Sequence, residues 1–282
     1  MLFELLVPLQ SIFSAFNVFR YITFRTMYAI ITGLVLSFAL GPVCIRLLKH
    51  YQLGERIQSD GPRNHLSKEG TPTMGGFLIL ASIGIPTLLW ANLRNPYVWL
   101  CLLSTFGYGA IGFWDDYLKL VDPEAKGLRV KPKLVAQFAL SFIIAMVIYR
   151  LGSAWPEATA LSIPFFKNLA PQLGWLYVPL AMLVIVGCSN AVNLTDGLDG
   201  LAIGPIIIAV STYMLIAYLV GHSRFATYLN LLYVSRAGEL AVFCGSIIGA
   251  GLGFLWFNSY PAQLFMGNVG SLALGGTLGS VA

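Results

Sequence analysis

Two adjacent aspartates, Asp115 and Asp116, are the residues of this chain whose types and spacing are best suited to chemistry. They come directly after the apolar run 97–114, in a chain of which only 10% is charged. Side chains of adjacent residues on a helix diverge by about 100°, so we expect the two carboxylates to have different roles. One could hold a divalent cation while the other acts as a base or orients a partner. The alternative is a hydrated helix end without a ligand.

A second polar cluster, residues 190–200, comes at the end of the apolar run 175–194. Asn193, Asp196 and Asp199 are spaced by three, so neighbouring members would share a face if the segment were helical. Oxygen ligands of this kind suit Mg²⁺, which takes one or two carboxylates and completes its shell with water and phosphate oxygens. The alternative is an Asx-rich turn in which Asp199 caps the following helix.

Four lysines and one glycine-rich segment are suited to binding phosphate groups. An ammonium group is a compact positive charge for a phosphate oxygen, and the lysines concerned are Lys68, Lys119, Lys131 and Lys133. The segment 70–76 opens an apolar run, and backbone amides at such a helix start could receive an anion. The alternative for any single lysine is the excess of positive charge that cytoplasmic loops carry without a ligand.

The elements that must position these residues are membrane helices. Hydrophobic residues make up 57% of the chain and the mean hydropathy is +0.76, whereas a soluble domain is roughly 45–50% apolar. A helix of about 20 apolar residues spans a bilayer, and we expect spans at 27–45, 74–93, 97–114, 134–149, 174–194, 201–220 and 239–257. An eighth apolar run begins at Val269 and stops at Ala282. We therefore predict an all-α, polytopic integral membrane protein of about eight membrane helices, with one transmembrane domain over 1–282 that ends inside the eighth.

The distribution of positive charge predicts the orientation of these spans. The loops 46–73 and 115–133 lie on the same side and together carry ten of the seventeen basic residues. Positive charge marks the cytoplasmic side, so we expect these loops inside and the N-terminus outside. The segments 190–200 and 258–267 then also face the cytoplasm. All the polar clusters would meet at one membrane face.

Several motifs together resemble the polyprenyl-phosphate N-acetylhexosamine-1-phosphate transferase superfamily, and within it the phospho-N-acetylmuramoyl-pentapeptide transferase family. They run through the chain in order: Gly-Thr-Pro-Thr-Met-Gly-Gly (70–76), Gly-Phe-Trp-Asp-Asp-Tyr (112–117), Pro-Phe-Phe-Lys (164–167), Asn-Ala-Val-Asn-Leu-Thr-Asp-Gly-Leu-Asp-Gly (190–200), Gly-Phe-Leu-Trp-Phe-Asn (253–258) and Pro-Ala-Gln-Leu-Phe-Met-Gly (261–267). The first and fifth of these are similar to the peptidoglycan branch in particular.

The resemblance implies a Mg²⁺-dependent enzyme of peptidoglycan synthesis, and hence of cell wall biogenesis, cell shape and cell division. Such an enzyme transfers phospho-MurNAc-pentapeptide from UDP-MurNAc-pentapeptide to undecaprenyl phosphate, giving lipid I and UMP. The resemblance also implies a ten-helix, multi-pass protein of the bacterial cytoplasmic (inner) membrane, usually a homodimer in the lipid bilayer, with its site in a cytoplasmic cleft. No nucleic-acid partner is expected.

The same resemblance assigns roles to individual positions. Asp115 and Asp116 match the catalytic pair, with Asp116 a candidate for deprotonating or orienting the lipid phosphate and Asp115 a candidate metal ligand. The positions matching the substrate-binding residues are Lys68, Thr73, Lys119, Lys133, Asn190, Asn193, Asp196 and Asp199. The family has an aspartate, its principal Mg²⁺ ligand, where this chain has Asn268. An amide offers one oxygen and no charge, so we expect weakened metal binding and impaired or absent activity, an expectation that the end of the chain at Ala282 reinforces.

Three other functions remain open on the sequence. A secondary transporter would use membrane carboxylates as a proton relay, and substrate flux without Mg²⁺-dependent nucleotide release would identify it. A sister transferase acting on UDP-N-acetylglucosamine shares the carboxylates, so competition between sugar nucleotides would separate the two. A catalytically inactive scaffold is the third, because of Asn268.

Overall fold

The structure is a computed structural model that describes residues 2–11, 13–50, 71–121, 127–152, 159–161, 163 and 170–282. Within those residues the chain forms helices and no β-strand, and one backbone bridge pairs Ala160 with Gln172. The elements are α1 (Leu2–Leu6), η1 (Pro8–Ser11), η2 (Ser14–Arg20), α2 (Ile22–His50), α3 (Gly76–Trp90), α4 (Pro96–Val121), α5 (Val130–Gly152), η4 (Gly174–Leu176), α6 (Tyr177–Thr195), α7 (Ile203–Val220), α8 (Ser223–Leu229), η5 (Ala237–Glu239), α9 (Leu240–Asn258) and α10 (Gly267–Val281).

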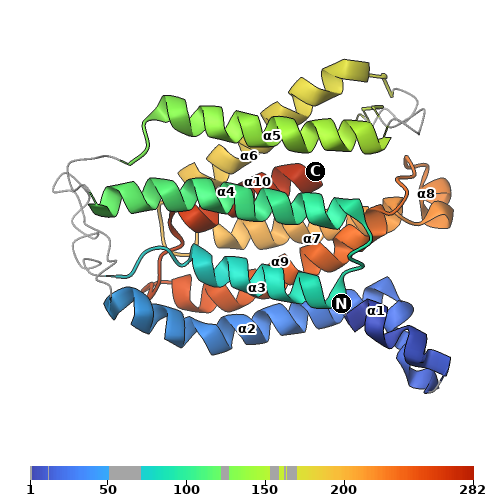
Figure 1. Cartoon of the computed structure of the whole chain (residues 1–282), viewed down its shortest axis with the longest axis horizontal. Coiled ribbons are helices and arrows are strands. Elements are labelled where there is room, and N and C mark those ends of the chain that lie inside the picture. Colours follow the sequence, from blue (N-terminus) through green and yellow to red (C-terminus); the bar gives the residue numbers. More distant parts are fainter. Residues whose placement is uncertain are drawn as a thin grey trace.

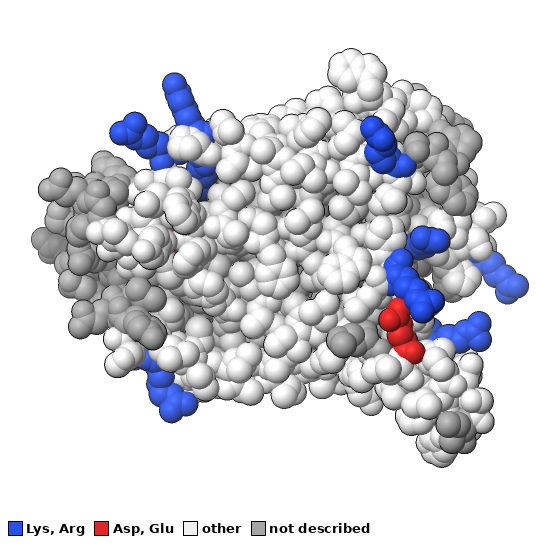
Figure 2. All heavy atoms as spheres, viewed as in Figure 1, with Lys and Arg blue, Asp and Glu red and all other residues white. Residues whose placement is uncertain are grey.

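Every apolar run expected to cross a membrane is helical, as α2 to α7, α9 and α10. In the part of the chain that the structure describes, six stretches are long and apolar enough to span a bilayer by length and composition: Ile22–His50, Pro96–Val121, Val130–Gly152, Gly174–Thr195, Ile203–Val220 and Ala237–Asn258. The helices α3 and α10 have 15 residues each. These findings confirm an all-α polytopic membrane protein. Figure 1 shows the long helices side by side along the long axis, and Figure 2 shows the charged side chains, most of them lysine or arginine, at the two ends of a face whose middle is uncharged.

The helix α9 is the centre of the bundle and packs against α2, α3 and α7. It is apolar on all sides, as expected of a helix that is largely buried. Three of its glycines, Gly245, Gly249 and Gly253, recur every fourth residue and face α2. A Cβ atom at Gly249 would overlap the carbonyl of Ile30, and one at Gly253 would overlap the side chain of Ser37. Small residues at this spacing allow two membrane helices to approach closely.

The helix α10 packs against α3, α4 and α6, and two glycines on its neighbours determine where its first turn lies. A Cβ atom at Gly112 in α4 would overlap the carbonyl oxygen of Asn268, and one at Gly76 in α3 would overlap the backbone of Gly270. Close approach at these two glycines therefore brings the start of α10 against the last turns of α4.

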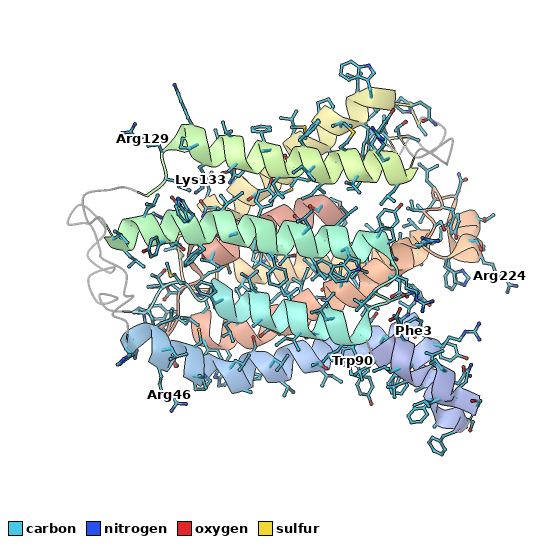
Figure 3. The ribbon with its side chains drawn as sticks, in the orientation of Figure 1. Phe3, Arg46, Trp90, Arg129, Lys133 and Arg224 are labelled. Carbon is cyan, nitrogen blue, oxygen red and sulfur yellow. The ribbon has the colours of Figure 1, made fainter. Side chains whose placement is uncertain are left out.

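The two ends of the bundle carry different residues (Figure 3). Arg46, near the end of α2, and Lys133, near the start of α5, lie at one end, which we call the site end. Phe3, Trp90 and Arg224 lie at the opposite end. Because successive long helices alternate in direction, the ends of α4, α6 and α9 and the starts of α3, α5 and α10 all reach the site end.

A buried ion pair joins three elements at the opposite end. The guanidinium of Arg25 in α2 is 1% exposed and donates two hydrogen bonds, of 2.6 and 2.7 Å, to the carboxylate of Glu239. It also donates to the carbonyl of Trp90 at 3.1 Å and lies 4.3 Å from the ring centroid of Phe3. A paired and hydrogen-bonded arginine can be buried where an isolated charge could not. This pair connects α2, α3 and η5.

Candidate active site

Asp115 lies at the centre of a hydrogen-bonded cluster at the site end. It is 3% exposed and lies within α4, because that helix continues beyond the apolar run to Val121 rather than ending before the aspartates. Its Oδ1 atom accepts from the backbone N–H of Leu128 at 2.6 Å. Its Oδ2 atom accepts from Nζ of Lys133 at 3.2 Å and from the side-chain amide of Asn268. One carboxylate therefore joins α4, α5 and α10.

Asp116 is directed to a different set of partners. Its Oδ2 atom accepts from the backbone N–H of Val269 in the first turn of α10 at 3.2 Å. Gly267 lies beside the same oxygen with φ +69, and a Cβ atom there would come within 2.9 Å of it and 3.1 Å of the Thr73 hydroxyl. The adjacent carboxylates thus have different surroundings, as their divergence on a helix predicts.

Two lysines balance the charge of the two aspartates. Lys119 lies one turn further along α4, with its Nζ atom 3.6 Å from Oδ2 of Asp115 and 3.6 Å from Oδ1 of Asp116. The side chain of Lys119 is 44% exposed, whereas that of Lys133 is 16% exposed. The partly open ammonium group of Lys119 can reach an anion in solvent while it remains next to the carboxylates.

A chain of amides continues the cluster from α10 to α6. Asn193 donates from Nδ2 to Oδ1 of Asn268 and to the hydroxyl of Ser271, the latter at 2.8 Å. Because an ionised carboxylate only accepts, the nitrogen of Asn268 must face Asp115 and its oxygen must face Asn193. One amide therefore connects α4 to α6 through α10.

Asn190 lies one turn before Asn193 on α6 and contacts α5. Its Nδ2 atom donates to Oε1 of Gln137 at 2.8 Å and to the carbonyl of Val186 at 2.9 Å. A cavity of 320 Å³ lies beside these contacts. The residues lining it are Asp115, Lys119, Leu128, Val130, Lys133, Leu134, Asn190, Asn193 and Asn268.

The remaining predicted residues of the 190–200 segment lie outside this lining. The helix α6 ends at Thr195, so Asp196 and Asp199 do not continue a helical face from Asn193. Asp199 accepts from the backbone N–H of Ala262 at 3.2 Å. The alternative that Asp199 caps the next helix is wrong, because Ala202 is the N-cap residue of α7.

Asn258 reinforces the connection that Asp199 makes to the loop after α9. Its oxygen accepts from the N–H of Gly200 at 3.1 Å, and its nitrogen donates to the carbonyl of Leu264 at 2.9 Å. The loop between α9 and α10 is therefore held against the turn between α6 and α7. Among the other sequence predictions, Thr73 and Asp116 both lie beside Gly267, and Lys68 lies outside the described residues.

Comparison with known proteins identifies the family. Residues 98–282 match the model of Glycosyl transferase family 4. Proteins named phospho-N-acetylmuramoyl-pentapeptide-transferase from Citrifermentans bemidjiense and Pelobacter propionicus are 54% and 55% identical over 282 residues, all of this chain and 78% of each relative. One of the same name from Desulfatibacillum aliphaticivorans is 56% identical over 284 residues, again all of this chain and 78% of the relative. The chain belongs to the phospho-N-acetylmuramoyl-pentapeptide-transferase family. The predicted family and all-α membrane fold are thus confirmed.

The described arrangement of this transferase-family chain does not fit a resident Mg²⁺ ion. Among the described residues no group of three His, Cys, Asp or Glu side chains could hold a metal. Both oxygens of Asp115 already accept from donors, and the only oxygen of Asn268 accepts from Asn193. The nitrogen of Asn268 faces Asp115, where a second carboxylate would have offered another oxygen.

The sequence prediction missed one buried residue of this transferase-family site. Gln137 is fully buried in α5 and accepts from Asn190, although it lies within the apolar run 134–149. A polar residue inside a membrane span usually faces the protein interior and finds a partner there. Its position one turn after Lys133 was the signal that could have identified it.

Proposed function

We propose that this chain transfers phospho-MurNAc-pentapeptide from UDP-MurNAc-pentapeptide to undecaprenyl phosphate and releases lipid I and UMP. The observation that carries the proposal is the cluster in which Asp115 meets Lys119 and Lys133 beside a cavity lined by polar side chains from α4, α5, α6 and α10. The names of relatives more than half identical to this chain support the choice of substrates.

The reaction moves a phosphorylated sugar between two phosphates. An oxygen of the lipid phosphate forms a bond to the phosphorus that carries MurNAc, and the bond from that phosphorus to the oxygen of UMP breaks. The reacting groups are all anionic, so holding them together requires compensating positive charge and correct alignment. Lys119 and Lys133 would supply that charge, because both line the cavity and both lie within 4 Å of Asp115.

The two aspartates support different contributions to this reaction. Asp115 lines the cavity and is placed to accept a proton from a protonated lipid phosphate or to orient Lys133 toward it. Asp116 lies behind the lining and holds the first turn of α10 through Val269. The sequence prediction that Asp116 acts on the lipid phosphate can be tested by comparing substitutions at the two positions.

Asn193 and Asn190 would contact the nucleotide-sugar, since both line the cavity from α6. Asp199 and Asp196 would act less directly, through the turn between α6 and α7 that Asp199 anchors. Mg²⁺ is the cofactor that the resemblance implies, and it would neutralise phosphate charge when bound. Because the described residues do not fit it, the steps proposed for this chain depend on its own lysines, carboxylates and amides.

The proposed setting is the bacterial inner membrane, with the site end on the cytoplasmic side and the N-terminus outside. The positive charges of the loops near the site end favour that orientation. One substrate is a membrane lipid and the other a cytosolic nucleotide, so a site at the inner membrane surface is where they can meet. A homodimer is a further prediction, which the resemblance alone supports.

A direct assay tests the proposed function. Purified chain in detergent micelles would be incubated with UDP-MurNAc-pentapeptide and undecaprenyl phosphate, with and without Mg²⁺, and UMP release measured. We expect release that requires both substrates and that responds weakly to Mg²⁺. UDP-N-acetylglucosamine in place of the first substrate is the control for the sister activity. No release above that of a chain carrying both Asp115→Asn and Lys133→Met would reject the proposal.

A further inference from the structure

Gln137 is a buried amide whose two ends have unequal surroundings. It is fully buried in α5, one turn after Lys133 and close to Leu134, both of which line the cavity. Its Oε1 atom accepts from Asn190 at 2.8 Å. Its Nε2 atom is buried and finds no partner among the described residues. A buried donor without an acceptor destabilises a fold, so this side chain contributes favourably only through its oxygen.

The carbonyl of Val186 and the side-chain oxygen of Gln137 together determine which way the amide of Asn190 faces. The carbonyl of Val186 can only accept, so the atom of Asn190 that contacts it must be nitrogen. Both hydrogens of that nitrogen are then used, one by Val186 and one by Gln137. Asn190 lines the cavity, and its side-chain oxygen is the atom left for a ligand.

We propose that Gln137 is a positioning residue that holds Asn190 with its side-chain oxygen toward the cavity, where it accepts a hydrogen bond from the nucleotide-sugar. The inference rests on the proposed function. An ionised phosphate offers only acceptors, so it cannot pair with this oxygen. The partner is instead a hydroxyl or amide N–H of the sugar, its peptide or the uracil. Asn190 therefore recognises a neutral part of the donor substrate, whereas Lys119 and Lys133 face its phosphates.

Two substitutions of Gln137 distinguish the effect of its hydrogen-bond acceptor from the effect of its side-chain volume. Gln137→Met keeps a similar volume and removes both the acceptor and the unpartnered donor, whereas Gln137→Glu keeps an oxygen facing Asn190. Calorimetry would measure the affinity of each variant for UDP-MurNAc-pentapeptide, UDP and pyrophosphate. Ser141→Ala, one turn further along α5 and also buried, is the matched control, since the Ser141 hydroxyl donates to the carbonyl of Phe138 in its own helix and Ser141 does not line the cavity.

We expect Gln137→Met to weaken the binding of UDP-MurNAc-pentapeptide about tenfold and to leave that of pyrophosphate unchanged. Gln137→Glu and Ser141→Ala should keep the affinity within about twofold of the unaltered chain, less than the loss of one hydrogen bond. If Gln137→Met also weakens the binding of UDP, the group that donates to Asn190 is on the uridine. If it weakens the binding of UDP-MurNAc-pentapeptide alone, that group is on the sugar or the peptide. Either result supports the proposal.

The double variant with Asn190→Ala distinguishes positioning from a general effect on the fold. If Gln137 acts through Asn190, Gln137→Met should cost no further affinity once Asn190 is alanine. The inference would be overturned if the two substitutions lowered the affinity for UDP-MurNAc-pentapeptide independently of each other. It would also be overturned if Gln137→Met weakened the binding of pyrophosphate equally. Gln137→Leu would replace the methionine variant if thermal unfolding showed that variant to be misfolded.

The same measurements separate this inference from the proposed function. A chain that binds UDP-MurNAc-pentapeptide but releases no UMP contradicts the proposed reaction, and the affinities of the Gln137 variants still decide the positioning role. A chain that does not bind the nucleotide-sugar contradicts both. Unchanged affinity of Gln137→Met, alongside normal turnover by the unaltered chain, contradicts the positioning role alone.

Discussion

The side-chain amide of Asn268 donates a hydrogen bond to the carboxylate of Asp115, across 153 residues of sequence. Its oxygen accepts from Asn193, so both ends of the amide are engaged within the protein. The acceptor oxygens of the described cluster at the site end are therefore paired with donors of the protein itself. These donors are two lysines, two amides and the N–H groups of Leu128 and Val269.

Asn268→Asp should allow the cluster around Asp115 to bind a metal ion. The substitution replaces the donor that faces Asp115 with a second carboxylate, and two carboxylates repel until a cation lies between them. We expect a lower melting temperature without Mg²⁺ and a recovery in its presence, since Mg²⁺ at 100 times its dissociation constant would contribute about 2.7 kcal/mol. Thermal unfolding with and without Mg²⁺ measures this.

The control for that prediction is Asn268→Ala, which removes the donor without adding a charge and should show no response to Mg²⁺. UMP release by Asn268→Asp should also become faster and more dependent on Mg²⁺ than that of the unaltered chain. If Mg²⁺ did not change the unfolding temperature of Asn268→Asp, the interpretation of position 268 as a metal-ligand position would be contradicted.

Asp115→Asn and Asp116→Asn should have different consequences. Asn at 115 places an amide against Lys133, which leaves the half-buried lysine without its carboxylate, so kcat should fall at least about 100-fold and stability should fall as well. Asn at 116 can still accept from Val269 through its oxygen, so the fold should be retained. UMP release and thermal unfolding, measured in parallel on both variants, check this.

The kcat of Asp116→Asn then tests the sequence prediction for Asp116. A loss of about 100-fold or more with KM unchanged is expected if this carboxylate acts on the lipid phosphate. A kcat close to that of the unaltered chain would assign the proton transfer to Asp115 alone.

Lys133→Met should weaken the binding of the nucleotide-sugar. Hydrogen bonds to charged groups contribute roughly 1.5–3 kcal/mol, so we expect KM for UDP-MurNAc-pentapeptide to rise about tenfold or more. Arg129→Met removes a neighbouring positive charge that is exposed and lies outside the cavity lining, and it should change KM by less than about twofold, as a screened surface charge would. Equal effects of the two substitutions would indicate a general charge effect rather than a contact in the cavity.

Gly112→Ala should separate α10 from α4. The added Cβ atom would overlap the carbonyl oxygen of Asn268, whereas a Cβ atom at Gly187 would meet nothing within 4 Å. Overpacking costs about 1–3 kcal/mol, so we expect Gly112→Ala to lower both the melting temperature and UMP release. Gly187→Ala is the matched control in a helix. A stable and active Gly112→Ala variant would show that the contact between α4 and α10 can relax.

The sequence by itself determined the class of protein and where its helices run. Lipid excludes unpaired backbone polar groups, so long apolar runs must be helical, and this one constraint predicted α2 to α7, α9 and α10. The types of Asp115, Asp116 and Asn193 also indicated an anionic, oxygen-rich site. The motif that contains Asn268 predicted, from the resemblance, a departure from the family at that position.

Only the tertiary structure decided which of these polar residues face one another. Spacing along the chain could not show that α6 ends at Thr195, which turns Asp199 toward Ala262 instead of the cavity. Nor could it show that Gln137 meets Asn190, because side-chain direction depends on how α5 and α6 are rotated against each other. Apolar patterning determines that a membrane helix forms, but glycine contacts and buried hydrogen bonds between distant segments determine its rotation and its neighbours.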